Sequence, residues 1–269
     1  HGAAFATALY RVGETRESKG STRVTTGMRI AMWSGPRNIS TAMMRAWENR
    51  GDTAVTDEPF YAHYLSSTGT QHPGREEVMA SQSIDWRVVA KSLTGPVPDG
   101  KTIWYQKHMT QHMLPDMPLD WLAGLVNCFL IRAPEEVVAS FTVIRPDAAL
   151  WELGFEQQAR LFEHVCKCSS SLPPVLDAAD VLKNPAGMLR ALCTRLGIAF
   201  TERMLHWPAG PRSSDGIWAK HWYQAVEHST GFEPYKPRDV HLSTFQARLA
   251  EQCRPFYERL AQHRLAATG

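Results

Sequence analysis

The stretch Met28-Arg-Ile-Ala-Met-Trp-Ser-Gly-Pro-Arg-Asn-Ile-Ser-Thr41 decides the fold of this chain. Its first six residues are mostly apolar and predict a buried strand. The Ser-Gly-Pro-Arg-Asn run that follows is typical of a loop. Ile39, Met43 and Trp47 then have the spacing of residues that share one face of a helix. A strand, a loop and a helix in this order form the first half of a βαβ unit.

The rest of the chain repeats this alternation, which predicts an α/β fold with a mainly parallel central sheet flanked by helices. Leu125–Ile131 is the most continuously apolar strand, so we expect it to be central in the sheet. The other expected strands are Met28–Trp33, Thr53–Thr56, Thr102–Lys107 and Pro174–Leu176. The expected helices are Ser40–Arg50, Glu76–Leu93, Pro134–Thr142, Leu150–Ser170, one that ends at Gly197, and one near Leu242–Leu265.

Length and composition predict one large domain. The chain has 269 residues, of which 43% are hydrophobic, and this is enough to bury a sizeable core. We expect the domain to cover residues 28–269. Residues 1–27 are rich in Ser, Thr, Gly, Ala and Arg without a clear period, and we place them outside the functional core as an extension or the remnant of a targeting peptide.

Charge and cysteine content exclude several classes of partner. The formal net charge of +2 does not favour nucleic acid or a membrane surface, and no apolar run approaches the roughly 18 residues of a membrane helix. The five cysteines are too irregularly spaced for a disulfide framework or a zinc site. We expect a cytoplasmic protein, or an organellar one if residues 1–27 are a targeting remnant.

The loop before the first helix is a candidate anion site. Such a junction directs several backbone N–H groups to one point at the positive end of a helix dipole. Arg37 adds a planar charged donor, and Ser40 and Thr41 add hydroxyl groups. The loop lacks the Gly-Lys-Ser/Thr ending that supplies the lysine and the magnesium ligand of an ATPase. The alternative is an ordinary loop before a Ser/Thr-capped helix.

The segment Pro36-Arg-Asn-Ile-Ser-Thr41 resembles the 5'-phosphosulfate-binding loop of the sulfotransferase family, Pro-Lys-Ser-Gly-Thr-Thr. The resemblance implies a P-loop-like fold, 3'-phosphoadenosine 5'-phosphosulfate (PAPS) as donor, and 3',5'-adenosine bisphosphate (PAP) as product. It also implies that donor-binding groups come from Ser34, Gly35, Arg37, Asn38, Ile39, Ser40 and Thr41. Arg37 replaces the lysine of the family and Ile39 its glycine, which is typical of a divergent branch.

Two later segments resemble the same family. In sulfotransferases an arginine after a central strand and a serine eight residues later hold the 3'-phosphate, and Arg132 and Ser140 match them. Gly210-Pro-Arg-Ser-Ser-Asp-Gly-Ile-Trp218 is similar to the C-terminal loop that closes over the nucleotide. The residues that match this loop are Arg212, Gly216 and Trp218. The tyrosine that contacts adenine in the family has no counterpart near Asp177. For Arg132 alone the alternative is a surface ion pair, which is the commoner role of an arginine.

The catalytic base has several candidates. A histidine follows the third strand in some sulfotransferases, and His108 and His112 are in the matching region. Glu58 resembles the base of bacterial and carbohydrate sulfotransferases. We expect Glu58 and His108 to contact the acceptor, with Arg37 stabilising charge. Each candidate base also has an alternative structural role, as a hydrogen-bonded histidine or an ion-paired carboxylate.

The expected function is sulfuryl transfer to a hydroxyl or amine of a small molecule, without a metal. The aromatic segments Tyr61–Tyr64, Trp151–Phe162 and Trp218–Tyr223 are the expected wall of the acceptor site. Two other functions remain open. A P-loop-class nucleotide kinase would depend on magnesium, and a non-catalytic phosphoadenosine-binding protein would form no product.

Overall fold

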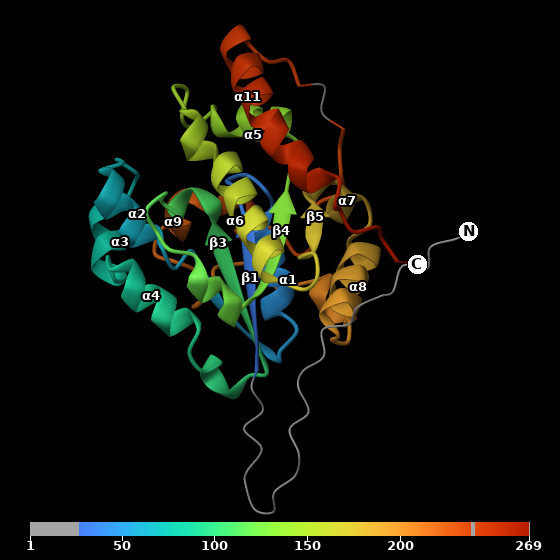
Figure 1. The fold of residues 1–269 in the computed structure, drawn as a ribbon. Helices are drawn as coiled ribbons and strands as arrows, with labels where there is room; N and C mark the ends of the chain where they lie inside the picture. Colours follow the sequence, from blue (N-terminus) through green and yellow to red (C-terminus); the bar gives the residue numbers. More distant parts are fainter. Residues whose placement is uncertain (1–26, 238–239, 269) are drawn as a thin grey trace, which may run out of the picture.

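A five-stranded sheet forms the centre of the molecule, with helices on both faces (Figure 1). The computed structural model describes residues 27–237 and 240–268. The strand order is β2-β3-β1-β4-β5, and every pair of neighbours is parallel. The strands are β1 Met28–Ser34, β2 Thr53–Asp57, β3 Ile103–Met109, β4 Val126–Ile131 and β5 Val175–Asp177. The predicted α/β fold with a mainly parallel sheet is therefore confirmed.

The helices follow the strands as crossover connections. The α-helices are α1 Ser40–Glu48, α2 Tyr61–Thr68, α3 Arg75–Ser81, α4 Trp86–Leu93, α5 Pro134–Phe141, α6 Phe155–Cys168, α7 Ala178–Lys183, α8 Pro185–Leu196, α9 Ala219–Trp222, α10 Gln224–Glu227 and α11 Thr244–Ala261. Short 3₁₀ helices are η1 Pro98–Gly100, η2 Thr110–His112, η3 Asp120–Gly124, η4 Leu150–Leu153 and η5 Glu202–Met204.

Two helices that we expected to be continuous are broken. The expected helix Glu76–Leu93 is divided into α3 and α4, because the Asp85 side chain accepts a hydrogen bond from Arg87 N and starts a new helix. The expected helix Leu150–Ser170 is divided at Gly154, whose φ of 73° is left-handed.

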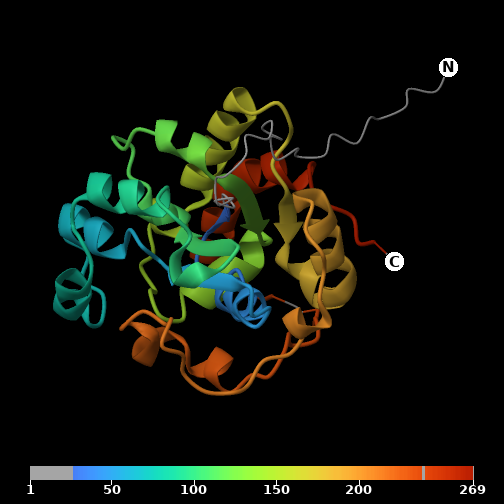
Figure 2. The same cartoon turned by 90° about the horizontal axis from the view of Figure 1, so that it is seen from below.

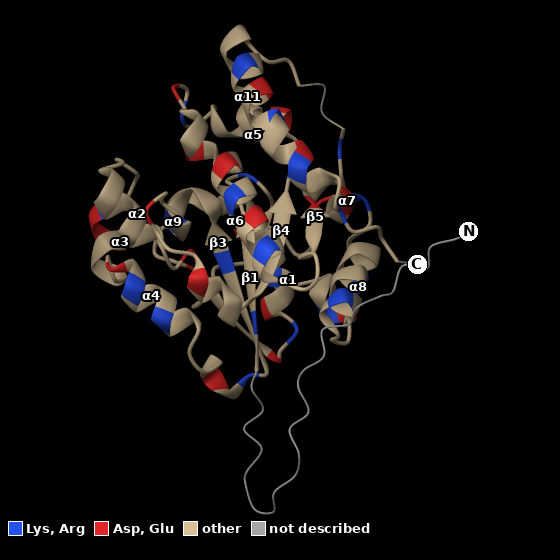
Figure 3. Ribbon diagram, viewed as in Figure 1, with Lys and Arg blue, Asp and Glu red and all other residues tan. Residues whose placement is uncertain are grey.

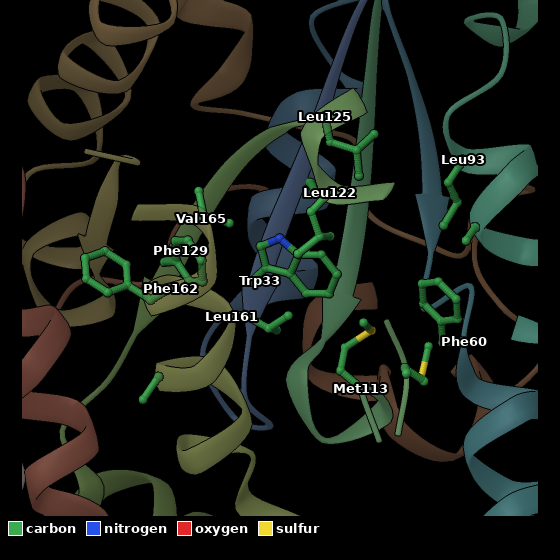
Figure 4. Packing of buried hydrophobic residues seen from close by; sticks show 14 of the residues in the cluster. Trp33, Phe60, Leu93, Met113, Leu122, Leu125, Phe129, Leu161, Phe162 and Val165 are labelled. Atoms are coloured by element: carbon green, nitrogen blue, oxygen red, sulfur yellow. The ribbon is translucent and has the colours of Figure 1, made fainter. Parts of the chain in front are cut away.

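The middle strand of the sheet is β1 rather than the more apolar β4, which lies between β1 and β5. Both faces of β1 are covered, because Ile30 and Met32 pack in one core cluster and Ala31 and Trp33 pack in the other. In Figure 4 the Trp33 ring lies among apolar side chains from several helices. The loop after β1 therefore leaves the middle of the sheet edge, where ligands bind in open α/β folds.

Charge is mainly carried by the helices, and the strands are mostly uncharged in Figure 3. β3 is an exception, because it contains the charged residue Lys107, and this side chain is only 1% exposed. Figure 2 shows a long orange segment after α8 that curves past α1, and this segment contains α9 and α10. Within residues 27–237 and 240–268, no helix combines the length and apolarity needed to cross a membrane.

Candidate functional site

The loop between β1 and α1 has a strained backbone. Arg37 and Ile39 have left-handed φ angles of 61° and 54°, and Glu58 after β2 has a φ of 39°. In the described ranges Asp99 is the one other non-glycine residue with positive φ. Such residues cost about 1–3 kcal/mol each and cluster at functional sites. Ile39 thus adopts a conformation that favours glycine, the residue at this position in the resembled loop.

Buried polar groups fix this loop to the sheet. Asn38 is 2% exposed, and its Nδ2 donates to the Leu130 carbonyl at 3.1 Å. Gln158 on α6 donates to the carbonyls of Trp33 and Leu130. A Cβ on Gly35 would lie 2.7 Å from the Leu153 carbonyl oxygen, so this position accepts only glycine. The loop is therefore held between the ends of β1 and β4 and the chain before α6.

The N-terminus of α1 has no side-chain cap. Ile39 is the N-cap residue, and it makes no side-chain hydrogen bond to the helix. The first N–H groups of α1 thus lack the usual intrahelical partners, which favours an anion at this end of the helix. The structure does not support the alternative of an ordinary Ser/Thr-capped helix.

Two predicted arginines meet beside this helix end. Arg37 Nε donates to Ser140 Oγ at 2.8 Å, and Arg132 Nη1 donates to the Arg37 carbonyl oxygen at 2.7 Å. Glu136 balances the charge, because its Oε2 accepts from Arg132 Nε at 2.7 Å. Arg132 is thus ion-paired, as the alternative interpretation required, but it also contacts the loop. Three of the residues that the resemblance selected lie together at the carboxyl ends of β1 and β4.

A buried cluster of charges lies at the ends of β2 and β3. Lys107 Nζ donates to Asp57 Oδ1 at 2.8 Å, to Glu58 Oε1 at 2.5 Å and to the Tyr223 hydroxyl at 2.7 Å. Asp57 also accepts from the Tyr223 hydroxyl at 2.7 Å and from Gly216 N at 3.1 Å. Within the described part of the chain, no hydrogen bond reaches Glu58 Oε2.

Burial and neighbouring charges shift the pKa values of Glu58 and Lys107 in this cluster. Burial raises the pKa of Glu58 above its ordinary range, although the Lys107 charge opposes the shift. Burial opposes the charge of Lys107, but Asp57 and Glu58 together raise the pKa of Lys107 well above its usual value. The cluster therefore contains a lasting cation and a carboxyl group whose pKa is shifted upward, as is typical of a carboxylate that acts as a general base.

The two candidate histidines lie in different surroundings. His108 stacks on Trp33 at 4.2 Å between ring centroids, and burial lowers its pKa to about 3. Lys107 and His108 are successive strand residues, so their side chains point to opposite faces of the sheet. His112 stacks on Tyr61 at 4.8 Å and feels the charge of Lys107, while burial is the main cause that lowers its pKa. His112 lies in η2, just beyond the end of β3, and the charges of both Lys107 and His108 act on it.

Rings from all three expected aromatic segments lie around His112, together with His72. They are Tyr61, Tyr64, His72, Trp151, Trp218 and Trp222, each with another ring of the group within 6.4 Å between centroids. Phe162, at the end of the second segment, packs instead against Phe129 and His263. Trp218 also donates from Nε1 to the Tyr223 hydroxyl at 3.3 Å. This aromatic cluster therefore adjoins the buried charges.

The segment from Arg212 to Tyr223 is fastened along α1 and β2. Asp215 forms a bidentate ion pair with buried Arg45, at 2.6 and 2.7 Å. The Arg212 guanidinium donates to the Pro208 carbonyl oxygen and lies 3.9 Å from Glu48 at the end of α1. The structure thus places Arg212 one helix length, roughly 13 Å, from the start of α1, whereas Gly216 and Trp218 lie by the charge cluster.

A family model described as a sulfotransferase domain matches residues 28–263. The chain belongs to the sulfotransferase family. Family membership supports a sulfotransferase function and accords with the α/β fold. Among the described residues, no group of three or more His, Cys, Asp and Glu side chains is arranged to hold a metal ion.

Two curated relatives of this sulfotransferase-family chain come from Arabidopsis thaliana. They are the branched-chain-amino-acid aminotransferase-like proteins 1 and 2, which are 36% and 35% identical over 236 residues. The match covers 87% of this chain but only 42% and 41% of theirs. The chain thus spans about two-fifths of the length of these relatives.

Two solved structures share the sulfotransferase fold. The sulfotransferase domain of the Synechococcus PCC 7002 olefin synthase has a TM-score of 0.51 and 17% identity, over 88% of this chain and 98% of that one. A sulfotransferase from Alicyclobacillus acidocaldarius has a TM-score of 0.51 and 11% identity, over 89% and 97%. At these identities the likeness concerns the fold alone.

The sequence analysis did not single out Asp57 or Lys107 as site residues, and it expected Tyr223 only as part of the aromatic wall. Lys107 did carry a signal, since a lysine inside an otherwise apolar or polar-neutral strand requires a buried partner. Asp57 directly faces Lys107 in the register of β2 and β3, but this pairing is not visible in the sequence. Tyr223 lies more than a hundred residues further along the chain.

Buried His108 predicts a loss of stability in acid. Above the ordinary histidine pKa of about 6.5, neutral His108 makes its full contribution to the free energy of unfolding. This contribution is lost as the pH falls toward about 3, the pKa of His108 in the folded protein. Between pH 7 and pH 5 the wild type should lose about 2 kcal/mol more than His108→Gln. Urea unfolding at both pH values measures this difference. His206→Gln, at an exposed position, is the control, and equal losses in wild type and His108→Gln would contradict the prediction.

Proposed function

We propose that the chain transfers the sulfuryl group of PAPS to a hydroxyl or amine of a small molecule and releases PAP. The observation that supports this most is the meeting of Arg37, Arg132 and Ser140 at the uncapped start of α1. Two guanidinium groups, a hydroxyl and free helix N–H groups suit a ligand with two separate anionic groups. Arg132 and Ser140 would hold the 3'-phosphate, and the loop with Arg37 the phosphosulfate.

The proposed chemistry needs one base and several cations. As the acceptor oxygen or nitrogen bonds to sulfur, the bond from sulfur to the phosphate oxygen breaks and the acceptor proton passes to Glu58 Oε2. Arg37 and Lys107 stabilise negative charge on the transferring and leaving groups. Arginine stays charged and acts only electrostatically at this position. Glu58 is preferred to His108, because His108 is on the opposite face of β3 from Lys107.

A thermal-shift titration with PAP tests this proposal. Saturating PAP should raise the melting temperature by several degrees, because a ligand that binds only the folded state stabilises it by mass action. Arg132→Ala should abolish most of this shift. Arg254→Ala is a matched control, since Arg254 also pairs with a glutamate of α5 but lies away from the loop after β1.

The comparison ligand is ATP with magnesium. A shift with ATP and magnesium but none with PAP would overturn the proposal and favour a nucleotide kinase. Binding of PAP without transfer from PAPS to any acceptor would favour a non-catalytic nucleotide-binding protein.

A further inference from the structure

Tyr235 lies over the same edge of the sheet as Arg132, although it belongs to a distant segment of the chain. Its hydroxyl donates to Glu136 Oε1 at 3.2 Å, and Glu136 Oε2 holds Arg132. One carboxylate therefore joins the tyrosine and the arginine. The phenol is also close enough to Arg132 and Asp177 to feel their charges. Tyr235 is only partly buried, so part of its ring is accessible.

The surroundings of this ring are polar and easily rearranged. Lys183 Nζ lies 4.8 Å from the centroid of the Tyr235 ring, and the lysine side chain is 56% exposed. A half-exposed lysine can turn away from an aromatic face at little cost. Lys183 also lines a cavity of about 290 Å³ together with Asp180, Asn184 and Leu265. Lys183 thus connects the Tyr235 ring with this cavity, so a planar group that displaces the lysine from the ring would have an acidic and an amide side chain close to its edge.

We infer that Tyr235 is the stacking platform for the purine base of the bound nucleotide. The inference rests on the proposed function, because Arg132 must hold the 3'-phosphate. In PAP the base and the 3'-phosphate are attached to the same ribose and are therefore close together. In the protein Tyr235 and Arg132 are also close, because both bind the carboxylate of Glu136. Any nucleobase can stack on an aromatic ring, whatever hydrogen-bonding groups its edge carries. Asp180 can accept a hydrogen bond from an exocyclic amine, and Asn184 Nδ2 can donate to a ring nitrogen.

The experiment compares PAP binding by wild type, Tyr235→Phe and Tyr235→Leu in calorimetric titrations. Loss of the ring in Tyr235→Leu should weaken PAP by about 5- to 150-fold. Tyr235→Phe keeps the ring but loses the bond to Glu136, so its affinity should stay within about twofold of wild type. Ribose 3,5-bisphosphate, which has no base, should bind wild type and Tyr235→Leu equally. Phe245→Leu, at an exposed aromatic position of α11, should bind PAP like wild type.

Three results would overturn the inference. If wild type binds PAP and Tyr235→Leu binds it equally well, the ring has no role and the proposed function still stands. If Tyr235→Phe is weakened as much as Tyr235→Leu, Tyr235 acts through Glu136 and Arg132 rather than by stacking. If wild type does not bind PAP at all, the proposed function fails and the inference fails with it.

Discussion

Glu58→Gln is expected to slow sulfuryl transfer by about 10²- to 10⁴-fold, the usual contribution of a general base. Glutamine keeps the shape of the side chain and can still accept the hydrogen bond from Lys107. It cannot take a proton from the acceptor. Because Glu58 does not contact Arg37, Arg132 or Ser140 through any hydrogen bond of the described residues, PAP binding should stay close to that of wild type.

The measurement uses radiolabelled PAPS and the acceptor with the highest turnover in a screen of hydroxyl and amine compounds. Glu76→Gln is the matched control, since the Glu76 side chain is 80% exposed, and it should transfer at the wild-type rate. A rate for Glu58→Gln within threefold of wild type would contradict the assignment. His112, which stacks on Tyr61 beside the charge cluster, would then be the residue to replace.

The pH profile gives a second test of Glu58. The carboxylate must be ionised to accept a proton, so the rate should fall as the pH drops through the pKa of Glu58. Burial raises this pKa above the ordinary glutamate range, so the acid limb should lie at higher pH than for an exposed glutamate. Glu58→Asp should keep an acid limb, and Glu58→Gln should lose it.

The anion-binding side of the site could be predicted from sequence because its parts follow strands. Arg37 comes after β1 and Arg132 directly after β4, and the carboxyl ends of parallel strands share one edge of the sheet. Once the sheet was predicted to be parallel, both arginines had to lie at this edge. Their meeting also depends on β1 and β4 being neighbours in the sheet, which only the structure shows. The bond from Arg132 to the Arg37 carbonyl oxygen required the structure, because it depends on the left-handed φ of Arg37.

The base side could be predicted only in part. The predicted strand ended at Lys107, whereas β3 continues to Met109, so the placement of Lys107 and His108 on opposite faces required the structure. The partners of Lys107 also required it, because they depend on which strand pairs with β3. Tyr223 reaches the cluster through a long segment whose course is fixed by the ion pair of Arg45 with Asp215. Pairs of this kind, 170 residues apart, leave no local pattern in a single sequence.

Lys107→Met is expected to lower the free energy of unfolding by about 3–5 kcal/mol, which is the usual cost of removing one partner of a buried ion pair. Methionine fills a similar volume, so the loss comes mainly from charge. Lys107 is 1% exposed and Asp57 is 5% exposed, so water cannot replace the ammonium group. Urea unfolding measures the change, and Lys220→Met at an exposed ion pair should leave stability unchanged.

The pH dependence separates this electrostatic cost from simple loss of packing. Without Lys107 its charge no longer opposes the effect of burial on Glu58, so the pKa of Glu58 should rise further above its value in the unfolded protein. A group with a raised pKa stabilises the fold below the unfolded pKa, and this contribution is lost as the pH rises through the folded pKa. The deficit of Lys107→Met should therefore be larger at pH 8 than at pH 5. Adding Asp57→Asn should recover part of it at pH 8, because one unpaired charge is removed. A packing defect would instead give the same deficit at both pH values, and Asp57→Asn would then add to the loss.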